Sequence, residues 1–337
     1  MKALRIIGYV FATFFAALAI GIVIALWVYR DIPATELEAR YANAASRFMN
    51  IDGVRIHYRD EGEGPAVLLL HANFSNLIGW DPWVAALEES YRVVRIDFTS
   101  HGLTGPDPTG DYTQERTIEL TEKFIDAIGL ERFSIGGTSM GGTIAIHYSN
   151  RHPERIDNLI LLSPGSLEGR DIKEGKDSKP GRRGEVPDAA YALAYILPRA
   201  LPEFMLIEGF GDDDKLTDDL IDRWHDMWLR EGQREAQLDR LSQYKAGAIE
   251  DVIRSLTPPT LLMWGEANTT AHFEQSQEFR ELLENVESLK FVSYPGVGHM
   301  AVQEAGFKTG RDVRAFLDER RELSQAAAEE EEEEEAG

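Results

Sequence analysis

The sequence predicts an α/β fold with a mostly parallel sheet that carries helices on both faces. Short continuous apolar runs, typical of strands buried on both sides, alternate with stretches of helical period. One run leads from Phe133 through Gly137-Thr138-Ser139-Met140-Gly141 directly into a helix-forming segment. The alternation stops between residues 164 and 257 and then resumes. This break predicts a helical cap inserted into one doubly covered sheet.

The N-terminal segment is uniformly apolar. No charged residue occurs from Ile6 to Tyr29, and this length suffices to cross a bilayer as a helix. We therefore expect residues 1–30 to form a single-pass membrane anchor, with the rest of the chain on the extracytoplasmic side. A cleaved signal peptide, with Ala17-Leu18-Ala19 as the cleavage site, is the alternative.

The first part of the predicted sheet follows a helical linker over residues 31–46. Asp52-Gly53 lies between two β-type runs and predicts a hairpin. Gly129 ends a helix of clear apolar spacing. The expected strands are Arg47 to Ile51, Val54 to Asp60, Ala66 to Leu70, Tyr91 to Ile96 and Ile156 to Leu162, and the expected helices are Trp83 to Glu88, Thr113 to Ile128 and the segment after Ser139 to about Arg151.

The cap and the second part of the sheet follow. Ser166 to Pro187 is polar and glycine-rich, which predicts a mobile loop. We expect cap helices over Ala189 to Leu197 and over Thr217 to Gly232, the latter with Thr217 as N-cap and Gly232 as stop. Strands are then expected at Thr260 to Trp264 and Leu289 to Ser293, and helices at Phe273 to Asn285 and Gly306 to Arg321. The sheet domain thus comprises residues 47–163 and 258–323, the cap 164–257, and an acidic disordered tail 324–337.

The composition excludes several function classes. The net charge of −23 among 337 residues argues against a nucleic-acid partner, which requires a basic face. Part of this charge is the run Glu329 to Glu335. The absence of cysteine excludes disulfides, thiolate zinc sites and cysteine nucleophiles.

The segment around Ser139 has the pattern of a nucleophile elbow. A G-x-S-x-G motif between a strand and a helix holds its serine on a sharp turn, so that the hydroxyl projects above the sheet. Gly137 and Gly141 are expected because a Cβ there would collide with the neighbouring strand and helix. Met140 follows the serine and offers a backbone N–H at a helix N-terminus, where a developing oxyanion is stabilised.

Taken together, these motifs resemble the α/β-hydrolase fold superfamily. The resemblance rests on the elbow, on the His71-led loop after one strand, on Asp97 followed by His101-Gly102, on Trp264-Gly265-Glu266 and on Gly296-Val297-Gly298-His299. It covers about residues 47–323 and is nearest to capped serine hydrolases such as esterases and meta-cleavage-product hydrolases. It implies a small-molecule ester or related carbonyl substrate and no metal or cofactor. Cleavage of a C–C bond by the same residues is the alternative reaction.

His299 is the expected general base. It follows the last predicted strand on a glycine-rich loop, and of the eight histidines it alone combines this context with a position after the serine. His71 and His101 are expected to hold loops. Similar proteins have His-Gly-x in the first loop, with the third residue donating to the oxyanion, which assigns the second donor to Asn73. The glycine of that pattern is Ala72 here.

The acidic residue expected as the third member of a Ser-His-acid triad is replaced by an amide. The family pattern places an acid three residues after the glycine of Trp264-Gly265, and this chain has Asn268 there. An amide can orient an imidazole but cannot neutralise an imidazolium, and it can select the wrong tautomer. Three explanations stay open: a deliberate Asp-to-Asn variant, another acid such as Glu266, or a weak or non-catalytic protein that kept the fold and binds a ligand.

Cap aromatics are candidates for the substrate pocket. Ligands of open α/β sheets bind at the carboxyl edge of the strands, beneath the predicted cap. The candidates are Phe74, Tyr195, Trp224 and Trp228, and packing of the cap on the sheet explains each of them equally well.

Overall fold

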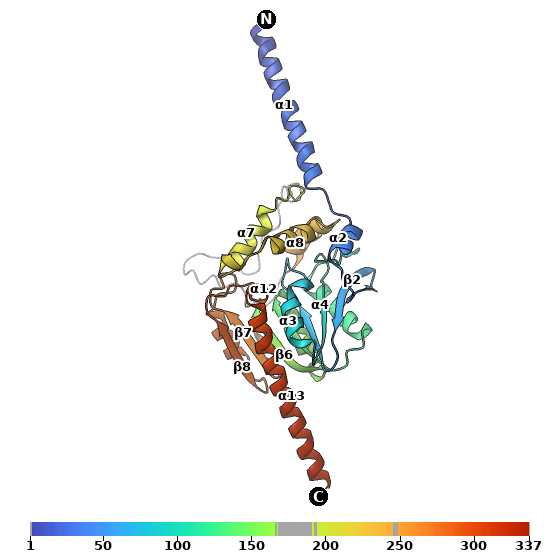
Figure 1. The fold of residues 1–337 in the computed structure, drawn as a ribbon, viewed down its shortest axis with the longest axis vertical. Coiled ribbons are helices and arrows are strands. Elements are labelled where there is room, and N and C mark those ends of the chain that lie inside the picture. Colours follow the sequence, from blue (N-terminus) through green and yellow to red (C-terminus); the bar gives the residue numbers. More distant parts are fainter. Residues whose placement is uncertain (1, 166, 168–190, 192–193, 245–248, 337) are drawn as a thin grey trace.

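An eight-stranded sheet with the order β1-β2-β4-β3-β5-β6-β7-β8 forms the centre of the molecule (Figure 1). The computed structural model describes residues 2–165, 167, 191, 194–244 and 249–336. The β1–β2 and β2–β4 pairs are antiparallel and the remaining pairs are parallel. The strands are β1 (Ser46–Ile51), β2 (Val54–Glu61), β3 (Ala66–Leu70), β4 (Arg92–Ile96), β5 (Phe133–Ser139), β6 (Ile156–Pro164), β7 (Thr260–Gly265) and β8 (Leu289–Tyr294). The predicted mostly parallel sheet is confirmed.

Alternate residues of the central strands face two separate cores. In β3, Val67 and Leu69 belong to one buried cluster, and Leu68 and Leu70 belong to the other. Helices α3 (Asp81–Leu87) and α13 (Gly306–Ala336) supply the first cluster, while α4 (Gln114–Ala127), α5 (Met140–Arg151) and α11 (Gln275–Leu282) supply the second. Both faces of β3 are therefore buried, which explains its continuous apolar sequence.

The described part of the cap consists of helices over the carboxyl edge of the sheet. They are α7 (Ala200–Gly209), α8 (Asp218–Trp228) and α9 (Gln233–Gln243). Helix α10 (Glu250–Arg254), at the end of the predicted cap, packs instead on the sheet domain: Ile253 joins its core, and Ser255 hydrogen-bonds Asn150 near the end of α5. Thr217 caps α8 as predicted, accepting a hydrogen bond from Leu220 N at 3.3 Å. The single helix predicted over Thr217 to Gly232 is wrong, because α8 ends at Trp228 and Gly232 (φ 75°) turns the chain into α9. Glycine is favoured there because a side chain is strained at positive φ.

Short turns in the sheet domain and in the cap complete the description. They are the 3₁₀ segments η1 (Leu77–Trp80), η2 (Pro153–Arg155) and η3 (Asp213–Lys215), and the short helix α12 (Ala301–Glu304). The polar loop predicted over Ser166 to Pro187 and most of the helix predicted over Ala189 to Leu197 lie outside the described residues.

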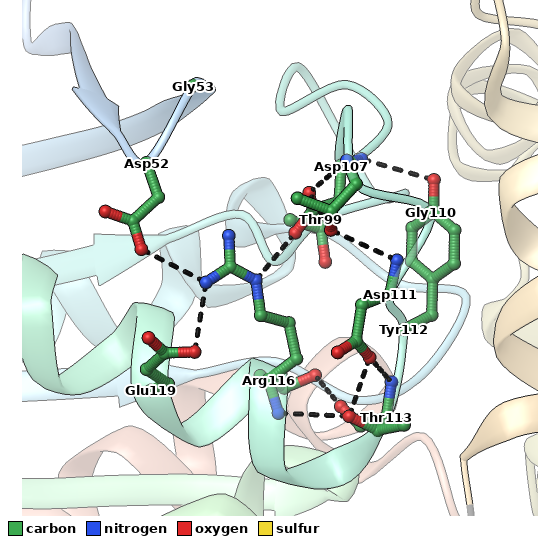
Figure 2. A network of polar contacts seen from close by, with 12 residues as sticks. Asp52, Gly53, Thr99, Asp107, Gly110, Asp111, Tyr112, Thr113, Arg116 and Glu119 are labelled. Carbon is green, nitrogen blue, oxygen red and sulfur yellow. Dashed lines mark hydrogen bonds and ion pairs between the residues drawn. The ribbon is translucent and has the colours of Figure 1, made fainter.

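A polar network fastens the loop after β4 to the start of α4 (Figure 2). Arg116 Nε donates to Asp107 at 2.9 Å, and its NH1 group donates to Asp52 in the β1–β2 turn and to Glu119. Thr113 caps α4 by accepting from Arg116 N. Burial lowers the pKa of Arg116, but the hydrogen bonds to these carboxylates outweigh it and raise the pKa above its usual value. The network therefore holds the loop after β4 in place at the carboxyl edge of the sheet.

The two ends of the chain extend away from the sheet domain in opposite directions (Figure 1). Helix α1 (Lys2–Val28) contains the stretch Arg5–Val28, which is long and apolar enough to cross a membrane by length and composition. Helix α2 (Ala34–Tyr41) occupies part of the predicted linker. The disordered tail predicted for 324–337 differs from the structure, in which α13 continues to Ala336. Alanine and glutamate are good helix formers, so this exposed segment needs no packing to favour a helix.

Candidate active site

Ser139 lies at the junction of β5 and α5 in an unusual backbone conformation. Its φ of 50° and ψ of −121° are strained for a residue with a side chain, and α5 begins at the next residue. A Cβ at Gly137 would come within 2.3 Å of Gly141, and a Cβ at Gly141 within 2.1 Å of Leu70 O. The close approach of strand, turn and helix predicted for an elbow is therefore present.

The two expected oxyanion donors come from neighbouring loops. Met140 N is the first N–H of α5 and has no partner within its helix. The contact of Gly141 with Leu70 and His71 places the start of α5 against the loop that leads to Asn73. Among the described residues, no backbone hydrogen bond engages Asn73 N. The side chain of Asn73 is turned to His101, with Oδ1 3.0 Å from its Nε2, so it is not directed to an oxyanion.

His71 and His101 hold these loops, as expected. His71 lies 2.7 Å from Ala72 O through Nδ1 and accepts from Phe98 N through Nε2. His101 contacts Thr99 O through Nδ1 and accepts from Phe74 N through Nε2. Burial lowers the pKa of both imidazoles, so both are neutral at pH 7.

His299 contacts Asn268 and is buried. Asn268 Nδ2 lies 3.1 Å from His299 Nδ1, and no hydrogen bond among the described residues joins His299 to Ser139. Burial lowers the pKa of His299 to about 4. Glu266 has an exposed side chain that accepts from Ser293 Oγ at 2.7 Å. Of the two candidates, Asn268 is the one whose side chain contacts His299.

The partners of Asn268 decide the tautomer of His299. Asn268 Oδ1 accepts from the backbone N–H groups of Thr270 and Ala271, at 3.0 and 2.8 Å. These two donors fix the amide with its oxygen toward the backbone and its NH₂ group toward His299. Nδ1 of His299 must then accept, which leaves the proton of a neutral imidazole on Nε2. This tautomer presents a donor, rather than a base, on the remaining nitrogen.

Glu304 holds the His299 loop and was not identified from the sequence. Its Oε2 accepts from Gly298 N at 2.7 Å and from Gly211 N at 3.0 Å. Met300 N donates to Gly209 O of α7 at 2.9 Å. Loop and cap are thus joined on both sides of His299. A buried glutamate five residues after the histidine carries no motif, so only the fold reveals its role.

The role of a further buried histidine, His57, was also not identified from the sequence. His57 Nδ1 lies 2.7 Å from Asp97 Oδ2, and its Nε2 lies 2.9 Å from Ser46 Oγ. Burial raises the pKa of Asp97, but the hydrogen bonds from His57 and from the backbone of Leu77 outweigh this and lower it. Ser46 Oγ is occupied by further donors, Asn43 N and Arg59 Nε. The arrangement therefore fixes the β1–β2 hairpin.

Three of the four pocket candidates lie together under the cap. Phe74, Trp224 and Trp228 belong to one apolar cluster with Met300, and Trp228 Nε1 donates to Phe74 O at 3.1 Å. Tyr195 is not in this cluster; it is 42% exposed and hydrogen-bonds Glu235. Among the described residues, no group of His, Asp or Glu side chains is arranged to hold a metal ion.

Comparisons with known proteins agree with this fold. The sequence pattern described as alpha/beta hydrolase fold matches residues 65–305. The 2-hydroxy-6-oxo-6-(2'-aminophenyl)hexa-2,4-dienoic acid hydrolase of Metapseudomonas resinovorans is 26% identical and covers 83% of this chain and 93% of its own. The cis-3-alkyl-4-alkyloxetan-2-one decarboxylase of Shewanella oneidensis is 32% identical, covering 82% and 89%. A putative lipase from Acinetobacter baumannii AYE has a similar structure, with a TM-score of 0.69, 21% identity, and coverage of 86% and 96%.

Proposed function

This chain belongs to the α/β-hydrolase fold family, and we propose that it is a serine hydrolase that cleaves a small-molecule ester or related carbonyl compound. The observation that carries the proposal is Ser139 in its strained conformation at the start of α5. Such a turn costs free energy and is retained where a nucleophile must project from the sheet. The proposal needs no metal or cofactor.

In the proposed reaction, Ser139 Oγ attacks the carbonyl carbon of the substrate. His299 takes the hydroxyl proton through Nε2 and later gives it to the leaving group. The N–H groups of Asn73 and Met140 stabilise the negative oxygen of the tetrahedral intermediate. Water then attacks the acyl-enzyme. His299 takes a proton from this water and gives it to Ser139 Oγ as the acid product is released.

Asn268 makes this reaction slow. The base form of His299 requires its proton on Nδ1, whereas the Asn268 amide favours the proton on Nε2. Asn268 also supplies no charge to stabilise the imidazolium that forms during the reaction. We therefore assign the chain a low turnover that resides in the chemical step.

A fluorophosphonate probe tests the nucleophile. Such a probe reacts with an activated serine hydroxyl, so the full chain should become labelled and the Ser139→Ala variant should not. Ser163 has a positive φ and is buried, and Ser163→Ala is the matched control that should retain labelling. A correctly folded full chain that resists the probe would instead favour a non-catalytic binding protein with the same fold.

Hydrolytic cleavage of a C–C bond is the second candidate reaction. The hydrolase of Metapseudomonas resinovorans, similar over most of this chain, acts on a 2-hydroxy-6-oxo-hexadienoic acid. The same serine, histidine and oxyanion donors serve both reactions. Turnover of such a dienoate above that of an activated ester would favour this candidate.

The proposed enzyme is held to a membrane by α1. Its stretch Arg5–Val28 is 24 residues long, and no residue in the most apolar part of this stretch is buried. We assign the hydrolase domain to the extracytoplasmic side, with the short N-terminal end inside. Protease added to sealed right-side-out vesicles should therefore digest the domain without disruption of the vesicles.

A further inference from the structure

Helix α7 carries apolar residues on its exposed side as well as on its buried side, with Glu203 and Glu208 as its only charged residues. Pro202, Leu206 and Gly209 are buried, while Leu201, Phe204 and Ile207 are 42%, 57% and 37% exposed in the part of the chain that the structure describes. These three residues recur at every third position and so lie along one side of the helix; we name them the outer face of α7. Large apolar side chains exposed together on a helix that also buries apolar residues are normally covered by protein or lipid.

The inner face of α7 contacts the loops of the candidate active site. Leu206 and Phe210 belong to the same apolar cluster as Phe74 and Met300. Phe74 follows the proposed oxyanion donor Asn73, and Met300 follows His299. Gly209 O accepts from Met300 N at 2.9 Å. One side of α7 therefore packs on the active-site loops, and its opposite side carries the exposed apolar residues of the outer face.

The chain leaves α1 directly onto the cap. Ile32 N donates to Leu229 O at 2.7 Å, and Glu231 N donates to Ile32 O at 2.9 Å. Arg234 of α9 donates to Asp31 Oδ1 and to Tyr29 O, the residue that follows α1. These bonds tie the cap to the chain within four residues of the end of α1, and Figure 1 shows α7 and α8 on the side of the domain from which α1 leaves.

We propose that the outer face of α7 inserts into the head-group layer of the bilayer that α1 spans, and that the substrate is a long-chain acyl ester that reaches Ser139 from this bilayer. The second part of this inference, the nature of the substrate, rests on the proposed function. Insertion of apolar side chains on one face of an interfacial helix is favourable. Exposed Glu208 of α7 and Asp212 just after the helix place negative charge beside this face, which favours an uncharged lipid surface over an anionic one.

Fluorescence quenching tests the docking surface. Because the chain has no cysteine, Phe204→Cys provides a single labelling site in the full-length protein. The label should be quenched at least threefold by brominated phosphatidylcholine in reconstituted vesicles. A label at Glu322→Cys, an exposed position in α13, should be unaffected. Equal quenching of the two labels, or shielding of the Phe204 label without quenching by the lipid, would overturn the docking surface.

Two esters test the route of entry. Phe204→Gln should lower hydrolysis of 4-methylumbelliferyl oleate in phosphatidylcholine vesicles at least tenfold, and change hydrolysis of the soluble butyrate ester less than twofold. Equal effects on both esters would overturn entry from the bilayer. Hydrolysis of neither ester by the full chain or its Asn268→Asp variant would overturn the proposed function and the lipid substrate, whereas the quenching result decides the docking surface independently.

Discussion

At position 268 the difference between an amide and a carboxylate decides which nitrogen of His299 carries a proton. A carboxylate at this place accepts from Nδ1–H, which leaves Nε2 free to take the proton of Ser139. We expect Asn268→Asp to raise turnover of a short activated ester by two to four orders of magnitude, or roughly 3–5 kcal/mol of transition-state stabilisation. The Michaelis constant should change little, because the gain lies in the chemical step. Steady-state kinetics measure both.

Glu266→Gln is the matched control for this substitution. Glu266 is two residues away, exposed and hydrogen-bonded to Ser293, so its neutralisation should leave turnover unchanged. An unchanged turnover in a folded Asn268→Asp variant would mean that Asn268 does not orient the base.

The pH dependence of the reaction follows from the burial of His299. Burial lowers its pKa to about 4, and a base acts only when it is neutral. For the chain with Asn268, kcat/KM should therefore stay level as pH falls from 7 and decline only near pH 4. In Asn268→Asp the new carboxylate stabilises the imidazolium and raises the pKa, so the decline should begin at a higher pH. Identical pH profiles for the two proteins would contradict this assignment.

The placement of single residues was predictable from the sequence where one local pattern determines it. Ser139 follows from its elbow, and His299 from a glycine-rich loop after the last strand. Glu304 and His57 were not predictable, since each acts through partners distant in sequence: Gly211 for one and Asp97 for the other. A buried polar residue without a motif is indistinguishable from a surface residue until the fold is known.

Among the elements, α4 and the loop before it depend on one buried ion pair (Figure 2). The Asp107 side chain is fully buried and accepts from Arg116 Nε at 2.9 Å. The amide of Asp107→Asn can adopt two orientations. In one its NH₂ group faces the Arg116 Nε–H, which is also a donor, and in the other Thr109 loses the oxygen that accepts its hydrogen bonds. We expect a loss of about 2–4 kcal/mol in the free energy of unfolding. Urea denaturation followed by circular dichroism measures it.

Glu119→Gln removes a second carboxylate from the same arginine and is the control for this prediction. The Glu119 side chain is 43% exposed, so solvent screens its interaction with Arg116. A loss under about 1 kcal/mol is expected. Equal losses of unfolding free energy in the two variants would show that burial does not make the Arg116–Asp107 pair stronger than the Arg116–Glu119 pair.

The elements of the sheet were more predictable than those of the cap. Continuous apolar runs such as β3 and β6 have one interpretation once they alternate with helices. Helix α7 has apolar residues on both its buried and its exposed side and so gives no helical period, and α9 buries polar residues, including Gln233 and Arg240, in place of an apolar stripe. Tertiary contacts, rather than a local pattern, determine these helices.

At the scale of the whole molecule, the segment between α1 and the sheet belongs to the folded domain. Asp31 and Ile32 bind the cap, and Leu37 of α2 is completely buried. Leu37 packs in one cluster with Ile78 of the sheet domain and Met227 of the cap. The sequence predicted only a linker here because its apolar residues are few. The folded domain therefore begins at about Tyr29, directly after α1, and not at the start of β1.

Two deletions test this boundary. The full chain should partition into membranes, and removal of residues 2–28 should release a soluble domain that retains hydrolysis of a short ester. Removal of residues 2–45 should also give a soluble protein, but one that has lost the Arg234–Asp31 ion pair, the backbone bonds of Ile32 and the burial of Leu37. Loss of the Leu37 side chain alone corresponds to about 2–3 kcal/mol. We therefore expect its free energy of unfolding in urea to be lower than that of the shorter deletion by at least about 3 kcal/mol. Equal stability of the two proteins would place the domain boundary at β1, and recovery of uncleaved full-length chain in the soluble fraction without detergent would exclude the anchor.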